Sequence, residues 1–431
     1  MKKNVLSVLL LQGLCALLSL SPSFAQSEAS SATYKIVTYL PTWKANYPAS
    51  INDFDVRKVT HICIAFANPD AAGNLIVSDN GQSGVATIVN AAHAKGTKVM
   101  ISIGGWVCPI AIYSNLLRTK KAAFVASIIK YVNDNNLDGV DVDLEGNVVD
   151  GNNVTAAEYQ AFIVALADGL RAQSRPLEIS AALANWFSQY ITTTAMNKFD
   201  FINMMAYDLA IAPQNPAGPH SPMSWAQENF NHWRNKGMPA NKLVLGVPFY
   251  GYAWGSYAAA GSSQDYCPIV TKYPGAENSD QQGSGSNAVY YNGIPTIRAK
   301  AQYVMSSNMG GIMIWEQTGD CPSGPKSLLD VINNVFGTNV GVEDNTAQSI
   351  NFEVFPNPVS DQVNIKFELA EKSAINLAIY SVDGRLVYQV ADGSFQGQTQ
   401  FTVPTKEFNA GIYILKLSTD KDTVVRKFSK E

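Results

Sequence analysis

The amino-acid sequence predicts an α/β barrel of eight strand–helix units, followed by a small all-β sandwich domain. Two observations lead to this prediction. Short apolar runs alternate with helical patterns from Lys35 to Phe336, and the residues after Phe352 differ in composition from those before it. Strands that alternate with helices favour a parallel sheet, whereas closely spaced short strands favour a sandwich.

The composition excludes several other classes of protein. Hydrophobic residues make up 46% of the 431 residues, which is too high a fraction for a disordered chain. Charged residues make up 15%, against about 25% in an average soluble domain, which argues against a long coiled coil. The formal net charge of −4 provides no basic surface for nucleic acid, so we expect no nucleic-acid partner.

Eight short apolar runs are the predicted barrel strands. In chain order they are Lys35–Leu40, Ile62–Ala67, Val99–Ile103, Gly139–Leu144, Leu177–Ala182, Phe201–Met205, Leu243–Val247 and Gly311–Ile314. The helical patterns that alternate with several of them are Gly84–Lys95, Thr119–Asn133, Thr155–Gln173, Pro222–Lys236, Pro295–Ser306 and Lys326–Phe336. This order fits a (β/α)8 TIM barrel, whose active sites lie at the carboxyl ends of the strands.

The fourth strand carries three acids on one face. Side chains alternate between faces along a strand, so Asp141, Asp143 and Glu145 lie together. The opposite face carries Val140, Val142 and Leu144. A barrel strand needs an apolar face toward its helices, so the three acids should point into the barrel. Buried like charges are costly, so at least one acid should keep a proton near neutral pH. Glu145 is outermost, where that proton can reach a substrate.

A divalent-metal site is the main alternative for three adjacent carboxylates, because hard cations bind clusters of oxygen atoms. One strand supplies all three acids, and no second acidic cluster converges in the sequence. We therefore expect neither a metal nor a cofactor.

Aromatic residues follow the ends of most other predicted strands. Five of the seven tryptophans lie just past such an end: Trp43, Trp106, Trp186, Trp254 and Trp315. A single tryptophan there would usually be core packing, but five on one rim indicate a groove that stacks on flat apolar faces, such as those of sugar rings. Trp225 and Trp233 fall in a helical pattern, and we expect them to serve packing.

Five motifs follow one another along the predicted barrel. They are Ser102-x-Gly104-Gly105, Asp138-Gly139-x-Asp141-x-Asp143-x-Glu145, Met205-Ala206-Tyr207-Asp208, Gly246-Val247-Pro248-Phe249-Tyr250-Gly251, and Trp315 on the last strand. Together they resemble glycoside hydrolase family 18, which contains chitinases and endo-β-N-acetylglucosaminidases. The similarity extends from about Ala32 to Phe336.

This resemblance implies a substrate-assisted retaining mechanism. Glu145 would protonate the glycosidic oxygen and then activate water, while Asp143 would orient the substrate's N-acetyl group. Asp141 would share a proton with Asp143, and Tyr207 would hydrogen-bond the acetyl carbonyl. The residues expected to bind substrate are Trp315, as the floor under the −1 sugar, with Asp208, Met205, Tyr39, Phe66, Trp106 and Tyr252.

The chain also departs from the commonest pattern of the family. Leu144 and Gly146 stand where aromatic residues are frequent, although neither removes a catalytic group. The segment Gly255–Gly310 is shorter than the insertion of processive relatives, which suggests an open cleft and endo action. Within it, Gly261–Asn287 is expected to be a mobile rim or an exposed linker.

The C-terminal residues 352–431 predict a separate β-sandwich. Charged residues make up 19 of these 80 residues, and none is tryptophan. The expected strands are Val363–Leu369, Ile375–Tyr380, Arg385–Val390, Thr399–Val403 and Ile412–Leu417, with turns at Asp383-Gly384 and Asp392-Gly393. Residues 339–351 read as a linker, which leaves 32–338 for the barrel.

Several motifs of this tail resemble the C-terminal sorting domain of the type IX (Por) secretion system. They are Phe355-Pro356-Asn357-Pro358, Asp383-Gly384-Arg385, Gly411-Ile412-Tyr413-Ile414-Leu415-Lys416 and Arg426-Lys427. The resemblance implies that the outer-membrane secretion machinery is a partner. A carbohydrate-binding module is the alternative, but it would normally need exposed tryptophans.

Residues 1–25 predict a secretory signal peptide with cleavage after Ala25. Lys2 and Lys3 precede an apolar run, and Cys15 lies in the middle of that run, which disfavours lipid attachment there. Export permits disulfides. A bond between Cys267 and Cys321 is one candidate, although sequence does not fix connectivity. Cys63 lies in a strand, and we expect a buried free thiol.

These observations predict a secreted, monomeric chitinase that acts on chitin or another glycan containing N-acetylglucosamine. The second prediction is an endo-β-N-acetylglucosaminidase that cuts N-glycans, because this enzyme uses the same chemistry as a chitinase. A chitinase-like lectin is the third, but such proteins typically lack the terminal acid that Glu145 provides here.

Overall fold

The structure, a computed structural model, describes residues 34–337 and 350–431, apart from residues 45, 78–80, 382–385 and 420–422. The predicted signal peptide and almost all of the predicted linker lie outside these residues. Within the described part, no helix has the length and apolar character needed to cross a membrane.

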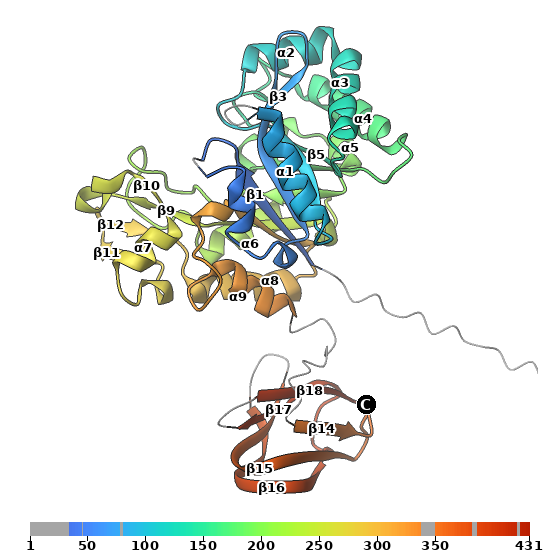
Figure 1. Ribbon diagram of the computed structural model, residues 1–431, viewed down its shortest axis with the longest axis vertical. Helices are drawn as coiled ribbons and strands as arrows, with labels where there is room; N and C mark the ends of the chain where they lie inside the picture. Colours follow the sequence, from blue (N-terminus) through green and yellow to red (C-terminus); the bar gives the residue numbers. More distant parts are fainter. Residues whose placement is uncertain (1–33, 45, 78–80, 338–349, 382–385, 420–422) are drawn as a thin grey trace, which may run out of the picture. The chain divides into compact units, whose positions relative to one another are not determined.

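Eight parallel strands close into a barrel (Figure 1). They are β1 (Lys35–Pro41), β2 (His61–Pro69), β4 (Lys98–Gly104), β5 (Gly139–Asp143), β6 (Glu178–Leu183), β7 (Phe201–Met204), β8 (Leu243–Pro248) and β13 (Gly311–Trp315). Their order is β1-β13-β8-β7-β6-β5-β4-β2, and pairing of β1 with β2 closes the ring. A short strand β3 (Leu75–Val77) pairs antiparallel with β2. The predicted (β/α)8 fold is confirmed.

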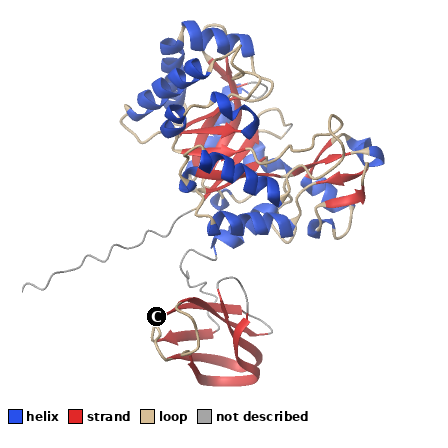
Figure 2. Ribbon diagram, turned by 180° about the vertical axis from the view of Figure 1, so that it is seen from behind, coloured by secondary structure: helices blue, strands red, loops and turns tan. Residues whose placement is uncertain are grey.

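Helices surround the strands (Figure 2). They are α1 (Gly81–His93), α2 (Ile110–Thr119), α3 (Lys121–Asp134), α4 (Ala156–Arg171), α5 (Thr193–Lys198), α6 (Met223–Asn235), α8 (Ile294–Ser306) and α9 (Leu328–Gly337). The sequence did not predict α2 or α5. A break at Lys120 separates α2 from α3, and the six residues of α5 are too few to show helical periodicity.

The barrel has apolar packing on both faces of its strands. Val140, Val142 and Leu144 belong to the large core between strands and helices, as the alternation along the fourth strand predicts. A smaller apolar cluster fills the interior of the barrel: Val37, Tyr39, Cys63, Ala65, Met100, Phe201, Tyr207, Val244 and Met313. The polar side chains of β5 must therefore share this interior with it.

A small α+β unit, called the insertion below, lies between β8 and α8. It contains β9 (Tyr250–Ala253), β10 (Ser263–Asp265), α7 (Tyr266–Lys272), β11 (Gln281–Ser284) and β12 (Asn287–Tyr290). Its strands form a four-stranded sheet in the order β10-β9-β12-β11. The segment Gly261–Asn287 is not an unstructured linker, because it contains β10, α7 and β11 and its Tyr266 is fully buried. That it forms a mobile rim stays a prediction.

The structure contains a disulfide between Cys267 and Cys321, which are 54 residues apart in the chain. This bond was one of the pairings that the sequence allowed. Cys63 and Cys108 are unpaired and buried, so the prediction of a buried free thiol at Cys63 is also confirmed.

Residues 350–431 form an antiparallel all-β unit. Its strands are β14 (Ile350–Phe355), β15 (Gln362–Ser381), β16 (Leu386–Pro404), β17 (Gly411–Thr419) and β18 (Thr423–Lys430). Both ends of β15 contribute to one core, on either side of a register shift after Leu369. The turn predicted at Asp392-Gly393 is wrong, because these residues lie inside β16 and pair with Asn376 and Ile375 of β15. The other predicted turn lies outside the described residues.

Candidate active site

Strand β5 and the residues just after it bring three carboxylates to one side of the barrel. Asp141 and Asp143 are 0% and 3% exposed. Glu145 follows the end of the strand and is partly exposed. The three acids therefore lie in order from the closed interior of the barrel to its open carboxyl end, on one side of the strand as the alternation predicts.

Asp141 is fully buried but well supplied with hydrogen-bond donors. Its carboxylate accepts bonds from the Tyr39 hydroxyl (2.8 Å), the Ser102 hydroxyl (2.8 Å), the Ser180 hydroxyl (2.6 Å) and the Asn203 amide (3.3 Å). Burial raises the pKa of Asp141, while these four hydrogen bonds counteract the rise. Strands β1, β4, β6 and β7 each contribute one donor, so the barrel is built to hold this carboxylate.

Asp143 has a less satisfied environment. Among the described residues, its buried Oδ1 atom has no hydrogen-bond partner. Burial, together with the nearby charges of Glu145 and Asp141, raises the pKa of Asp143 well above its ordinary value. A carboxyl group in this position favours its protonated form, which can donate a hydrogen bond to an incoming acceptor.

Glu145 lies where a proton can be exchanged with a bound molecule. Burial raises its pKa to about 7, and the negative charge of Asp208 adds to the rise. A group with such a pKa can both give and take a proton near neutral pH. Asp208 itself accepts a hydrogen bond from the Tyr250 hydroxyl and adopts a φ of 61°, which is uncommon for a residue other than glycine.

Tyr207 reaches the interior because Gly246 on the neighbouring strand leaves room for it. A Cβ at Gly246 would lie 2.2 Å from the Met204 carbonyl oxygen and 3.0 Å from the Tyr207 ring. The Tyr207 side chain is buried, and its hydroxyl contacts the sulfur of Met313 at 3.9 Å. Burial raises the pKa of Tyr207 well above its ordinary value, so the hydroxyl stays protonated and can donate.

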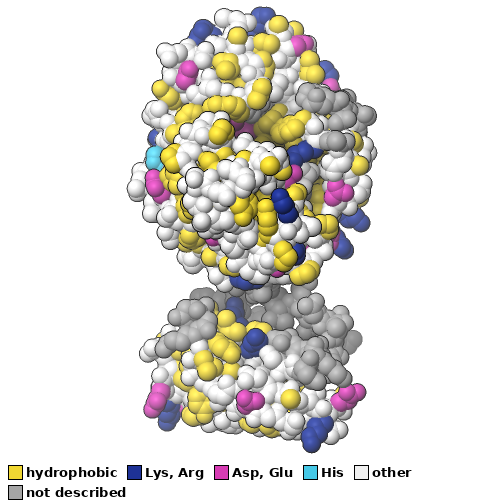
Figure 3. Space-filling view, turned by 90° about the vertical axis from the view of Figure 1, so that its left-hand side faces the viewer, with side chains coloured by type: hydrophobic (Ala, Val, Ile, Leu, Met, Phe, Trp, Pro, Cys, Tyr) yellow, Lys and Arg dark blue, Asp and Glu magenta, His cyan; other side chains and the backbone are white. Residues whose placement is uncertain are grey.

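One wall of the site is aromatic. The ring of Trp315 lies 5.2 Å from Tyr39, 5.9 Å from Phe66 and 6.3 Å from Trp43 between ring centroids. Trp43 is 48% exposed, so this cluster, called the Trp315 wall below, presents an open apolar surface. A space-filling view of one face shows hydrophobic side chains gathered around a hollow (Figure 3).

A second aromatic surface lies on the segments that follow β4 and β6, the two strands that pair with β5. Trp106 and Trp186 are 59% and 56% exposed, and their rings meet edge to face at 6.2 Å. Trp186 packs so closely on Gly146 that a Cβ there would lie 2.0 Å from its ring. The glycine that departs from the family pattern is thus matched by a tryptophan from the loop after β6.

The other predicted substrate-binding residues lie near this centre. Met205 packs partly buried against the interior cluster that contains Tyr207. Tyr252 lies 5.6 Å from Tyr250, which in turn lies 6.3 Å from Tyr207 between ring centroids. The structure therefore brings all predicted site residues to the carboxyl end of the barrel or into its interior.

Sequence reasoning missed several polar residues of the site. Ser180 and Asn203 hold Asp141, and Tyr250 holds Asp208. The available signal was a polar residue at an inward position of an apolar strand, which applies to Ser180 in β6 and Asn203 in β7. Among the described residues, no group of three or more His, Cys, Asp or Glu side chains is arranged to hold a metal ion.

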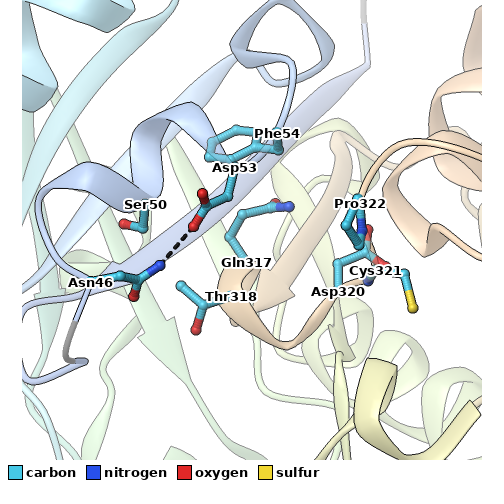
Figure 4. A pocket seen from close by; sticks show the side chains of 9 residues that line it. All are labelled: Asn46, Ser50, Asp53, Phe54, Gln317, Thr318, Asp320, Cys321 and Pro322. Carbon is cyan, nitrogen blue, oxygen red and sulfur yellow. Dashed lines mark hydrogen bonds between the residues drawn. The ribbon is translucent and has the colours of Figure 1, made fainter. Parts of the chain in front are cut away.

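A separate cavity of about 250 Å³ lies between residues 46–54 and 317–322 (Figure 4). None of the three carboxylates lines it. Its half-buried acid, Asp320, accepts hydrogen bonds from the backbone N–H groups of Leu328 and Leu329 at the start of α9. Asp320 therefore has a structural role at the start of α9, and the cavity is separate from the three carboxylates at β5.

Comparison with known proteins gives two family matches. Residues 35–320 match the model of the glycosyl hydrolases family 18. Residues 353–431 match the model of the secretion system C-terminal sorting domain.

Several individual proteins are similar to the barrel. Chitinase A1 of Niallia circulans is 26% identical over 72% of this chain and 60% of its own length. The endochitinase of Manduca sexta is 27% identical over 70% of this chain and 58% of its own length. An oviduct-specific glycoprotein of Mesocricetus auratus is 26% identical over 70% of this chain, which spans 54% of that relative. The chain thus covers less than two thirds of each of these relatives.

Among solved structures, the GH18 chitinase ChiB from the chitin utilization locus of Flavobacterium johnsoniae has a TM-score of 0.61 and 35% identity, over 71% of this chain and 94% of its own. A chitinase from Bacteroides thetaiotaomicron has a TM-score of 0.63 and 22% identity, over 70% of this chain and 96% of its own. The second match bears on the fold alone.

Proposed function

Because the chain belongs to glycosyl hydrolase family 18, we propose that it is a chitinase that hydrolyses β-1,4-linked N-acetylglucosamine polymers with retention of configuration. The observation that supports this proposal is the difference in burial and pKa among the three acids at β5. A buried, hydrogen-bonded Asp141 leads to a buried Asp143 with a raised pKa, and then to a partly exposed Glu145 with a pKa of about 7.

In the proposed reaction Glu145 is the general acid and then the general base. It donates its proton to the glycosidic oxygen as the bond to the anomeric carbon breaks. The carbonyl oxygen of the substrate's own N-acetyl group forms the new bond to that carbon, as in substrate-assisted families. The Glu145 carboxylate then takes a proton from a water molecule, which restores the acid. The oxygen of this water bonds to the anomeric carbon as the acetyl oxygen leaves it.

The neighbouring residues position the N-acetyl group. Protonated Asp143 has a buried, unpartnered oxygen atom that would face the acetamide, and the Tyr207 hydroxyl is a second donor for the acetyl carbonyl. Asp141 shares a proton with Asp143, and the four hydrogen-bond donors around Asp141 hold its carboxylate in place. Asp208 lies close enough to influence Glu145 and would position the sugar.

The aromatic surfaces suit an uncharged polysaccharide. The Trp315 wall, which includes Phe66 and Tyr39, would pack under the sugar at which cleavage occurs. Trp106 offers an exposed ring on the segment after β4, and Tyr252 extends the series of rings beyond Tyr207. Stacking of this kind requires no charge on the ligand.

The similar proteins favour chitin as the substrate, since two of the relatives and both solved structures are named chitinases or endochitinases. The oviduct-specific glycoprotein has no such name. The proposal of hydrolysis therefore rests on the three acids at β5 rather than on family membership.

Glu145→Gln tests the proposal. It keeps the shape of the side chain but removes the proton that the reaction needs, so we expect kcat on chitin oligosaccharides to fall by orders of magnitude, with oligosaccharide binding largely retained. Glu228→Gln, an exposed change on α6, is the matched control. Turnover by Glu145→Gln equal to that of the control would overturn the assignment.

Two other functions are outcomes of the same experiment. Cleavage of a high-mannose glycoprotein in preference to chitin oligosaccharides would assign an endo-β-N-acetylglucosaminidase. Binding of chitin oligosaccharides without release of sugar from either substrate would assign a lectin.

We further propose that residues 353–431 direct export through the type IX secretion machinery to the cell surface or the medium. The match of this segment to the sorting-domain family supports the proposal.

A further inference from the structure

A fully buried lysine lies behind the candidate active site. Lys300 on α8 is 0% exposed. Its ammonium group donates hydrogen bonds of 2.7 Å to three oxygen atoms, the backbone carbonyl and hydroxyl of Ser221 and the side-chain carbonyl of Asn292. All three acceptors are uncharged. Burial lowers the pKa of Lys300 to about 7, although the charge of Asp280 opposes this.

Ser221 connects this lysine to the residues of the site. The Ser221 hydroxyl donates a 2.7 Å hydrogen bond to the carbonyl oxygen of Ala206, which directly precedes Tyr207. The backbone N–H of Leu209 donates to the carbonyl oxygen of His220 at 2.9 Å. These two bonds join the ends of the segment 206–221, and Lys300 binds at that junction.

The segment 206–221 carries two groups that would contact the substrate in the proposed reaction, Tyr207 and Asp208. Tyr207 and Asp208 lie at its start, and His220 lies at its end. The buried His220 ring places Nδ1 3.6 Å from an Asp208 carboxylate oxygen and packs 5.0 Å from Tyr250 and 5.2 Å from Tyr252 between ring centroids. A shift at the base of the segment would therefore move several active groups together.

Simple packing does not require a cation at this position. A methionine has similar length, and burying it costs no hydration of a charge. A lysine instead supplies three donors in fixed directions, which here join the segment 206–221 to Asn292 after β12. The insertion, α8 and the loop after β7 thus meet at one ammonium group.

We propose that Lys300 is a positioning residue for the hydrolysis, which holds the segment 206–221 so that Tyr207 and Asp208 keep their places beside Glu145. This inference rests on the proposed function, because the positions of these two side chains matter only if the site cleaves a glycan. Lys300 lies behind the segment and acts through Ser221.

Lys300→Met in the full chain tests the inference with chitin oligosaccharides. We expect kcat to fall on the order of 10- to 100-fold, because small displacements of positioned groups cost this much. The value of KM should change little, since the Trp315 wall comes from other strands. Arg298→Met, an exposed change on the same helix, is the control. A kcat equal to that of the control, or a rise in KM alone, would overturn the proposal.

Ser221→Ala provides a second variant, which removes one hydroxyl and remains informative if Lys300→Met fails to fold. We expect the same loss of kcat at nearly constant KM. The double variant should lose little more than either single variant, because both changes break one connection. Additive losses would show that the two residues act separately and would contradict the proposal.

The failure of this inference is distinguishable from that of the proposed function. If the wild-type protein cleaves neither chitin nor N-glycans, the proposed function fails. Crystal structures of Lys300→Met and Arg298→Met then test, without any activity, whether Lys300 holds the segment 206–221 in place. A Ser221–Ala206 hydrogen bond and a Tyr207 position that are unchanged in Lys300→Met would overturn it.

Discussion

The proton on Glu145 sets the pH range in which the proposed reaction can start. A general acid must be protonated in the free enzyme, and the pKa of Glu145 is raised to about 7. We therefore expect kcat/KM to fall as the pH rises through about 7, since Glu145 then loses its proton. Initial rates on soluble oligosaccharides across acidic and alkaline pH would measure this limb. A rate that stays constant well above neutral pH would contradict the assignment of Glu145 as the acid.

Asp208→Asn tests the cause of the raised pKa. The negative charge of Asp208 disfavours ionisation of Glu145, so its removal should lower the pKa of Glu145 and move the alkaline limb of kcat/KM to lower pH. The maximal rate should also fall, because Asp208 is a proposed substrate contact. Asp134→Asn, an exposed change on α3, should leave the limb in place. An unchanged limb in Asp208→Asn would show that burial alone sets the pKa.

The sequence could predict the acids of the site but not their support. Alternation along one strand is a local property, so the shared face of Asp141, Asp143 and Glu145 followed from the residues alone. The donors to Asp141 come from four other strands, and which of their residues meet depends on the register between strands. In the same way, the contact of Lys300 with Ser221 joins residues 79 positions apart in the chain, and no local pattern predicts it.

At the scale of elements, the barrel strands were predictable because each is buried on both faces. Such strands appear as continuous apolar runs, and the predicted bounds differ from the observed ones by at most two residues at each end. The insertion lacked this signal. Its strands are three or four residues long, and β10 and β11 are rich in polar side chains, so its fold depends on scattered buried tyrosines and a disulfide.

The disulfide attaches the insertion to the end of the barrel. Cys267 follows β10, whose Asp265 pairs with Lys44 at 3.0 Å, and Cys321 lies a few residues after Trp315. We expect Cys267→Ser/Cys321→Ser to lose about 2–4 kcal/mol of unfolding free energy, the typical effect of removing a disulfide. Thermal unfolding with and without a thiol reductant would measure this. The reductant should lower the Tm of the wild type and leave that of the variant unchanged, and equal Tm values for the two proteins would contradict the expectation.

At the scale of the whole molecule, the apolar cores divide the chain into parts. The clusters of the barrel contain described residues between Ile36 and Phe336. A separate cluster lies between Phe352 and Phe428. Because each part buries its own apolar surface, each has the means to fold by itself.

Deletion of Phe352–Glu431 separates catalysis from export. The truncated protein, purified from cells, should keep the kcat and KM of the full chain on chitin oligosaccharides, since every residue of the candidate site lies before the deletion. In the producing bacterium it should accumulate in the periplasm, because the segment that matches the sorting-domain family is missing. Fractionation followed by detection of the protein would measure its distribution.

The full chain with Glu145→Gln is the control, which should leave the periplasm although it lacks activity. Appearance of the intact truncated chain in the medium would contradict the export role, whereas loss of activity in the purified truncated protein would show that the tail also supports the barrel.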